Sequence, residues 1–538
     1  MGKTIALLVA LLAVVLGPIL MRPRGDDAML RGQDTLTVIT PHNEAIRSEF
    51  SEAFREWYRA KTGRIVLVEW LTPGGTSECT LFLNSAYSAA FEAHWKGKLG
   101  RKWDNDAKEG CLDPRTIPAA SPAADTQRQA ARRAFLTSNV GVKIDVFFGG
   151  GSYDFIKMAS IGLLVDCGYV AAHPEIFGPG KSIPPMLGGE PYYDEKGRWI
   201  GTTLGAFGIV YNRDQLARLG LPEPRQWSDL ADPRYFRALA LANPIQSGSA
   251  NKAFEMLIQQ QMNIVAAEPG ADEALITHEG WTSAMRLLQR IGANARYFTD
   301  SSSKIALDVE AGEAAAGMTI DFYGRFQSET VRRPDGSSRI GYTDAQGGTS
   351  YGTDPIGLLR GAPHPELGKK FIEFVMTDGQ KLWGWKAGAP GGPHQRSLRR
   401  LPMLPDLYAP KFREFRSDPG VFPYEAAKHF TYEGKRTAPY FNAIAFVVRV
   451  MCIDTHRELI AAWQALIESK QRTGKFPPDA LAAFEDVSVV DYAAVSTRIR
   501  DAVASGAPKI AQVRLAKELA DRFRANYRRA EELAREDR

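Results

Sequence analysis

The chain has 538 residues, enough for about two to four compact domains, and its 44% hydrophobic, 10% aromatic and 24% charged residues are typical of a folded protein. Lysine and arginine outnumber aspartate and glutamate by 67 to 62, a surplus too small to indicate nucleic acid as a partner. The four cysteines form no C-x-x-C pair, which argues against a zinc ribbon or a thioredoxin-like redox site.

The N-terminal segment, residues 1–32, contains an uncharged apolar run at 5–21. The run is slightly short for a membrane-spanning helix and contains Gly17 and Pro18, which suits the hydrophobic region of an export signal. No A-x-A cleavage site follows, so the segment is predicted to be either an export signal or an uncleaved anchor. The lack of a polar face argues against a cytosolic protein with a buried N-terminal helix. We therefore predict a periplasmic or extracytoplasmic protein, with membrane contact only through residues 5–21.

The first half of the chain alternates strands and helices. Strands are predicted at 36–39, 64–70 and 142–148, and each is followed by a polar or glycine-rich loop and a helix. Small molecules bind at the carboxyl ends of strands in open α/β sheets, where helix N-termini present unbonded N–H groups. These loops therefore predict a binding cleft.

Residues 80–140 interrupt this pattern with a long helix and an irregular, proline-containing insert, which either covers the cleft or docks a partner. Cys79 and Cys111 flank part of the insert, and we predict a disulfide between them.

The second half of the sequence predicts a second lobe and then a return of the chain to the first lobe. Residues 199–211 resemble two short strands linked through glycines, which is typical of a crossover, and α/β alternation then continues. From about 410 the sequence is mostly helical, and its last helix is predicted to be a solvated amphipathic helix docked on a lobe. The predicted domains are lobe 1 (33–205), lobe 2 (206–335), a return to lobe 1 (336–410) and a mostly helical C-terminal extension (411–538).

Residues 211–230 contain the most specific pattern in the chain. From Asn212 to Leu230 they resemble the "N-x-x-x-L-x-x-x-G-L-P-x-P-x-x-W-x-D-L" pattern of bacterial extracellular solute-binding proteins of ABC importers. The resemblance is to type II periplasmic binding proteins of the ferric-binding-like group and covers roughly residues 34–405. It implies an α/β, two-lobed type II periplasmic-binding-protein fold with crossover hinge strands, to which this chain adds the helical extension, and a ligand enclosed by hinge closure.

The resemblance and the predicted strand ends select the same loops as the walls of the cleft. The predicted ligand-binding residues are Thr40, His42, Gly75, Thr76, Ser77, Gly150, Gly151, Ser152, Thr203, Ser247, Gly248, Ser249, Asp300, Ser301, Asp321 and Tyr323. For each of them the alternative is local helix capping, because Ser, Asp and Asn are frequent before helices.

The sequence does not identify the ligand. Ferric binders of this group use two adjacent tyrosines and a first-lobe carboxylate, where this chain has Phe322-Tyr323 and a glycine within 149–151. Direct chelation of Fe(III) is therefore disfavoured unless Asp300, Asp321, Glu78 or His42 compensates.

Two features of the predicted cleft point to an organic ion. The Ser/Gly loop at 247–249 resembles an anion seat, whereas Asp300, Asp321 and Asp354 suit a cationic group. An iron(III)-type complex, a phosphonate or zwitterion, and a polyamine or thiamine-like cation are the solutes considered.

The motifs typical of enzymes are incomplete. Ser301-Ser302-Ser303-Lys304 matches S-x-x-K and Lys61-Thr62-Gly63 matches K-T-G, but their order is the reverse of that in penicillin-binding proteins, and no S-D-N lies between them. We predict a protein that is not an enzyme and uses no cofactor. Its predicted partners are a small-molecule or ion ligand and an ABC transporter permease. The alternative is a membrane-anchored, ligand-gated sensor or interaction protein on the same fold.

Overall fold

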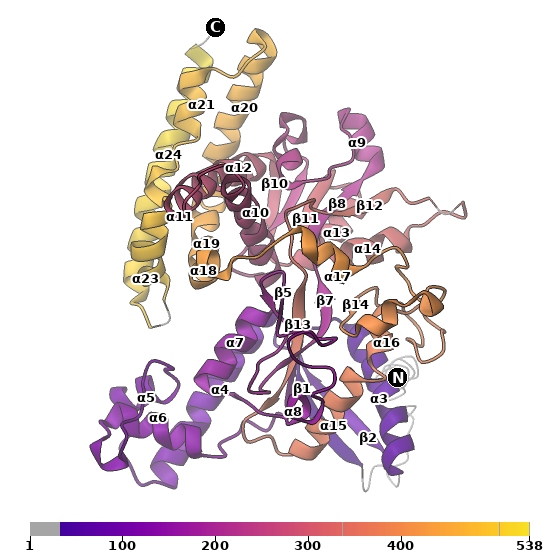
Figure 1. Ribbon diagram of the computed structural model, residues 1–538. Coiled ribbons are helices and arrows are strands. Elements are labelled where there is room, and N and C mark those ends of the chain that lie inside the picture. Colours follow the sequence, from indigo (N-terminus) through magenta and orange to yellow (C-terminus); the bar gives the residue numbers. More distant parts are fainter. Residues whose placement is uncertain (1–32, 336, 505, 537–538) are drawn as a thin grey trace, which may run out of the picture.

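The computed structural model describes residues 33–335, 337–504 and 506–536, so the predicted export signal or anchor lies outside the described residues. The described residues form two large sheets, each with its own hydrophobic core (Figure 1). The seven-stranded sheet has the order β14-β7-β13-β3-β1-β2, with β4 paired to β13, and the five-stranded sheet has the order β10-β9-β11-β8-β12. This arrangement confirms the predicted two-lobed α/β fold.

The strands of the first lobe are β1 (Asp34–Ile39), β2 (Val66–Leu71), β3 (Val146–Phe148), β4 (Leu164–Val165), β7 (Ile200–Gly205), β13 (Gly352–Leu359) and β14 (Leu401–Pro402), with a hairpin of β5 (Met186–Leu187) and β6 (Glu190–Pro191) beside them. The second lobe contains β8 (Phe207–Asn212), β9 (Leu239–Ala242), β10 (Ala295–Thr299), β11 (Ala316–Ile320) and β12 (Ile340–Asp344). Because β12 pairs antiparallel with β8, the second sheet extends beyond residue 335, and the return to the first sheet begins with β13 rather than at 336.

Parallel pairing and buried strands organise the first lobe. Strand β1 pairs in parallel with both β2 and β3, and Leu36 and Val38 on it are fully buried. The helices of this lobe are α3 (Glu44–Thr62), α4 (Thr76–Gly97), α5 (Asn105–Cys111), α6 (Gln127–Thr137), α7 (Ser152–Ile161), α8 (Tyr169–Ala172), α15 (Pro365–Met376) and α16 (Gln380–Gly384). Helix α3 buries Phe50 and Phe54 on one face, and Gly63 ends it in the left-handed conformation.

The predicted disulfide between Cys79 and Cys111 is wrong, because all four cysteines are free and buried. Cys111 Sγ instead lies 3.4 Å from the carbonyl oxygen of Lys108 within its own helix. The insert at 80–140, part of which the two cysteines flank, contains α5 and α6, which lie at the outer end of the first lobe (Figure 1).

We expect the native protein to resist thiol reagents. Burial raises the pKa of Cys79 to about 12 and that of Cys111 to about 11, so neither thiol is ionised appreciably at pH 8. Titration with a chromogenic disulfide should proceed slowly in buffer and detect four thiols after unfolding without reductant. Detection of only two thiols in the unfolded chain would show that the predicted disulfide does form.

The second lobe continues into the C-terminal helices. Its helices are α9 (Arg213–Leu219), α10 (Gly248–Ala266), α11 (Glu273–Leu275), α12 (Trp281–Asn294), α13 (Ser302–Glu310) and α14 (Asp321–Thr330). The extension contains α17 (Pro423–Ala426), α18 (Gly434–Thr437), α19 (Phe441–Val448), α20 (His456–Thr473), α21 (Pro478–Phe484), α22 (Tyr492–Ala494), α23 (Arg500–Val503) and α24 (Lys509–Glu536).

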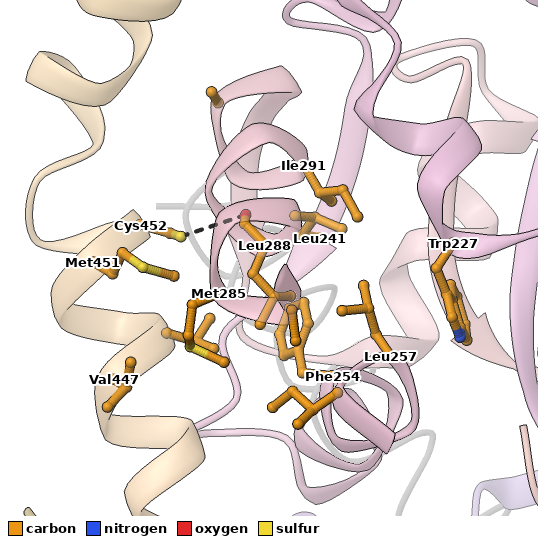
Figure 2. Close-up of a cluster of buried hydrophobic side chains, with 14 of the residues drawn as sticks. Trp227, Leu241, Phe254, Leu257, Met285, Leu288, Ile291, Val447, Met451 and Cys452 are labelled. Carbon is orange, nitrogen blue, oxygen red and sulfur yellow. Dashed lines mark hydrogen bonds between the residues drawn. The ribbon is translucent and has the colours of Figure 1, made fainter. Parts of the chain in front are cut away.

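One hydrophobic core joins the second lobe to this extension. Figure 2 shows Val447, Met451 and Cys452 facing Met285 and Leu288 of α12. The Sγ atom of Cys452 lies 3.7 Å from the carbonyl oxygen of Leu288. The C-terminal helices from α19 onward are therefore an integral part of the second lobe, whereas Tyr424 and Ala426 of α17 pack against the first-lobe core.

The apolar composition of this region follows from its burial. No single helix in the described part of the chain is long and apolar enough to cross a membrane. Residues 434–453 and 456–473 reach that composition only jointly, across a bend of 62°. Their apolar side chains, Val447 and Trp463 among them, belong to the second-lobe core.

Within the described residues, the chain crosses between the lobes at three places. The first crossing joins β7 to β8 at residue 206, and the second joins β12 to β13 through residues 345–351. The third leads from the first-lobe segment after β14 through residues 427–441 to the C-terminal helices of the second lobe. The cavity described next is lined from both lobes and from this third crossing.

Candidate functional site

A cavity of about 820 Å³ lies between the two lobes. Seven helices of the described chain, α3, α4, α7, α10, α13, α14 and α19, begin at its wall. The first turn of a helix has N–H groups without an intrahelical acceptor, and the helix dipole places partial positive charge there. The cavity is thus surrounded by helix ends that favour an anionic group.

Glycines make two of these helix starts fit together. A Cβ atom on Gly149 would lie 2.4 Å from the ring of His42, and one on Gly150 would lie 2.6 Å from Thr76 Cγ2. Both glycines also have positive φ angles, of 91° and 127°. Gly149 and Gly150 are therefore required for the loops after β1, β2 and β3 to meet at the cavity.

Arg400 is the most distinctive residue of the cavity wall. Its guanidinium forms an ion pair with Asp354 through Nη1, whereas Nε and Nη2 are buried and have no hydrogen-bond partner among the described residues. The guanidinium carbon lies 4.3 Å from the ring centroid of Phe322, which comes from the second lobe. Since a buried donor without a partner is costly, these nitrogens are suited to an oxyanion of a solute.

His42 stands on the other side of Asp354. Its Nε2 atom lies 3.7 Å from Asp354 Oδ2, and its ring packs edge-on against Phe148. Burial lowers the pKa of His42, although Asp354 opposes the shift, so the imidazole is neutral at pH 7. Burial raises the pKa of Asp354, but Arg400 and His42 outweigh it, so that the pKa lies below its usual value. Asp354 is thus a carboxylate that holds Arg400 in place.

A second charged group, around Lys252, spans the two lobes. The ammonium Nζ of Lys252 lies 3.0 Å from Glu190 of the first lobe and 2.9 Å from Glu255 of its own helix. It also lies 3.7 Å from the ring centroid of Tyr432. Burial lowers the pKa of Lys252, but Glu190 and Glu255 outweigh it and raise the pKa well above its usual value. This group ties the lobes together at one part of the cavity wall.

Three further carboxylates on the wall, those of Glu78, Asp154 and Asp300, have no ion-pair partner within the described ranges. Burial raises the pKa of Asp154 to about 6, so it is still mainly ionised at pH 7. Such carboxylates accept hydrogen bonds from hydroxyl or amino groups. The cavity therefore combines a place for an anion with acceptors for donor groups on the same solute.

The wall offers little to a bare metal ion. Among the described residues, the one group of three side chains whose ligand atoms could share a metal is Glu52, Glu56 and His394, and none of these lines the cavity. Tyr323 lines it beside Phe322, with ring centroids 4.1 Å apart.

Most of the predicted site residues are brought together at this cavity. Those that line it are His42, Gly75, Thr76, Gly150, Gly151, Ser152, Ser247, Gly248, Ser249, Asp300, Ser301 and Tyr323. Whether they contact a solute stays a prediction.

Thr40, Ser77, Thr203 and Asp321 do not line the cavity. The hydroxyl of Thr40 donates to the backbone oxygen of Phe148, and that of Thr203 donates to the backbone oxygen of Leu401. Both hydroxyls therefore stabilise the first-lobe sheet. The backbone oxygen of Ser77 accepts a hydrogen bond from Thr80 within α4. Asp321 is buried and forms an ion pair with Arg325 at 3.1 Å, so its carboxylate is already occupied. The insert at 80–140 also contributes no lining residue, so it does not cover the cavity.

Sequence reasoning missed Arg400, Lys252 and Phe441 as wall residues. Arg400 and Phe441 lie in segments that no strand-end pattern marks. Lys252 lies one turn inside α10, next to the predicted loop at 247–249, and a charged residue in the first turn of that helix was the available signal.

Comparison with known proteins agrees with this architecture. Residues 143–386 match a family model described as "Bacterial extracellular solute-binding protein". This segment of the chain is similar to a bacterial extracellular solute-binding domain. This match confirms the resemblance based on residues 211–230, which lie inside the matched segment. A domain of this family implies a periplasmic or extracytoplasmic location.

Two curated proteins match part of the chain. An "Uncharacterized protein" of Haemophilus influenzae is 25% identical over 247 residues, which are 45% of this chain and 61% of the relative. The "Phosphoglycerate transport regulatory protein PgtC" of Salmonella typhimurium is 28% identical over 184 residues, which are 34% of this chain and 40% of the relative. The chain thus spans less than two thirds of the length of either relative.

Solved structures are similar at lower identity. The periplasmic binding protein AfuA from Actinobacillus pleuropneumoniae has 15% identity and a TM-score of 0.46, covering 80% of this chain and 97% of its own. Iron-bound HitA from Pseudomonas aeruginosa has 16% identity and a TM-score of 0.42, covering 77% of this chain and 99% of its own.

Proposed function

We propose that the protein is the extracytoplasmic solute-binding component of an ABC importer and captures a small organic anion by closure of its lobes. The observation that carries the choice of an anion is Arg400, whose buried guanidinium has two nitrogens without a hydrogen-bond partner in the described chain. Arginine recognises carboxylate and phosphate groups through pairs of such donors.

The helix starts and the unpaired carboxylates refine the solute class. Phosphate and phosphonate groups bind at helix N-termini, and seven helices of the described chain begin at this wall. Glu78, Asp154 and Asp300 are acceptors for hydroxyl or amino groups on the rest of the solute. We therefore favour a phosphorylated or phosphonate solute with such groups, and the phosphoglycerate in the name of PgtC supports this choice.

The other predicted solutes are supported less well. An iron(III) ion bound directly to protein ligands would need several oxygen donors, and the described wall has no cluster of three metal ligands. A polyamine has no oxygen that could accept hydrogen bonds from Nε and Nη2 of Arg400. The matched family consists of solute-binding proteins and does not favour the alternative of a ligand-gated sensor.

Lobe closure would complete the site, because the wall residues come from both sheets and Arg400 already contacts Phe322 of the second lobe. The closed form would then be recognised by a permease. Anchoring through residues 5–21 is a further part of this proposal.

The test is a measurement of unfolding stability with defined solutes. A solute at 100 times its Kd raises the free energy of unfolding by about 2.7 kcal/mol. We expect 3-phosphoglycerate or 2-aminoethylphosphonate to do so, and spermidine or Fe(III) without phosphate to have no effect. A response to spermidine or Fe(III) alone, or none to either organic anion, would contradict the proposed class.

A further inference from the structure

The C-terminal segment at 427–441 is part of the cavity wall as well as a connection between the lobes. Tyr432, Ala438 and Phe441 all line the cavity. The ring of Phe441 meets that of Tyr153, at the start of α7 in the first lobe, with centroids 4.8 Å apart and planes at 36°. These two rings face each other from opposite lobes.

Hydrogen bonds hold this segment to the first lobe. The N–H of Tyr432 donates to the backbone oxygen of Gly188 at 2.8 Å. The backbone oxygen of Tyr432 lies so close to Gly189 that a Cβ atom there would be 1.8 Å from it. Gly189 also has a φ of 82°, a conformation that favours glycine. The segment therefore fits against the β5–β6 hairpin with no room for a side chain between them.

A second set of bonds holds the segment to α10 of the second lobe. Tyr432 and Thr437 both donate their hydroxyls to Glu255, at 2.7 and 2.6 Å. Asn251 donates its amide to the backbone oxygen of Phe441 at 2.8 Å. Glu255 and Asn251 are almost fully buried, at 1% and 2% exposure. A segment held by three hydrogen bonds to buried side chains on one side, and by a backbone hydrogen bond and close packing on the other, does not behave as a mobile flap.

We propose that Tyr153 and Phe441 form a fixed end wall of the solute cavity, so that the C-terminal segment sets the length of solute that the protein accepts. This inference rests on the proposed function, because it assigns a selecting role to a part of the same cavity. The extension then contributes to solute selection in the binding site as well as to the second-lobe core.

The first arm of the test needs no solute. In the variant Tyr153→Cys/Phe441→Cys, a short bis-maleimide should crosslink the two new thiols, since the four natural cysteines are buried. Neither single variant should react internally, and Tyr153→Cys/Phe422→Cys is the matched control, because Phe422 is 46% exposed and does not line the cavity. Failure of the first pair to crosslink, or equal crosslinking of the control pair, would overturn the wall.

The second arm asks whether the wall formed by Tyr153 and Phe441 stays closed during solute binding. The crosslinked protein should bind 3-phosphoglycerate with a Kd within about threefold of the uncrosslinked variant. A loss of more than tenfold would show that this end opens during binding and would overturn the proposal.

Selectivity is measured as the ratio of the Kd values for 3-phosphoglycerate and the longer 6-phosphogluconate. Phe441→Ala should shift that ratio at least fivefold toward the longer solute, and Phe422→Ala should leave it unchanged. An unchanged ratio in Phe441→Ala would overturn the selecting role. If the wild type binds neither solute, the anion proposal fails instead, and crosslinking alone decides whether the wall exists.

Discussion

Replacement of Arg400 by glutamine should weaken binding of 3-phosphoglycerate or 2-aminoethylphosphonate by about a hundredfold, measured by calorimetric titration. The guanidinium is the buried cation whose Nε and Nη2 atoms have no hydrogen-bond partner in the described chain. Loss of charge-assisted hydrogen bonds to an oxyanion costs about 3 kcal/mol, which is about a hundredfold in Kd. Arg396→Gln is the matched control, because Arg396 lies on the same segment but is exposed and does not line the cavity.

The same substitution also breaks the ion pair with Asp354, so binding and folding need to be separated. Removal of one partner of a buried pair costs about 3 kcal/mol of stability. The double variant Arg400→Gln/Asp354→Asn removes the uncompensated charge and should recover most of this stability without recovering solute binding. If the double variant binds the anion as tightly as the wild type does, Arg400 does not recognise it.

The fold was predictable because its signals are local. Alternating buried strands and amphipathic helices follow from periodicity, as Leu36 and Val38 on β1 and Phe50 and Phe54 on α3 show. The pattern at 211–230 added the family. The prediction of a disulfide was wrong because two cysteines that flank part of an insert need not lie close together. A reduced cysteine packs well in a protein core, and both of these thiols are buried.

The candidate site was predictable only where its residues follow strands. Loops such as 149–151 and 247–249 reach the cavity because parallel strands end at one edge of a sheet. Thr203 and Asp321 also lie near strand ends, but they point into the protein, since a strand-end position does not fix the direction of a side chain. Arg400 and Phe441 reach the cavity wall through long-range packing, which no local sequence pattern predicts.

Replacement of Lys252 by methionine should be among the most destabilising changes in the chain, by about 3 to 5 kcal/mol at pH 8. Lys252 compensates Glu190 and Glu255, whose side chains are each 1% exposed. Without the ammonium, these carboxylates stay buried as uncompensated charges. The measurement is urea unfolding at pH 5 and pH 8, with Lys517→Met as control, because Lys517 is 79% exposed.

The pH dependence distinguishes this mechanism from loss of packing. In the wild type, the pKa of Lys252 is raised, so its stabilisation is complete below the unfolded pKa and is lost only as the pH rises through the folded one. In Lys252→Met two buried carboxylates are left without their shared cation. Because uncompensated buried negative charge should cost less stability at pH 5 than at pH 8, the loss of stability should be smaller at pH 5. Addition of Glu190→Gln and Glu255→Gln should remove this pH dependence. A deficit equal at both pH values would show that Lys252 acts through the packing of its side chain over Tyr432 rather than through its charge.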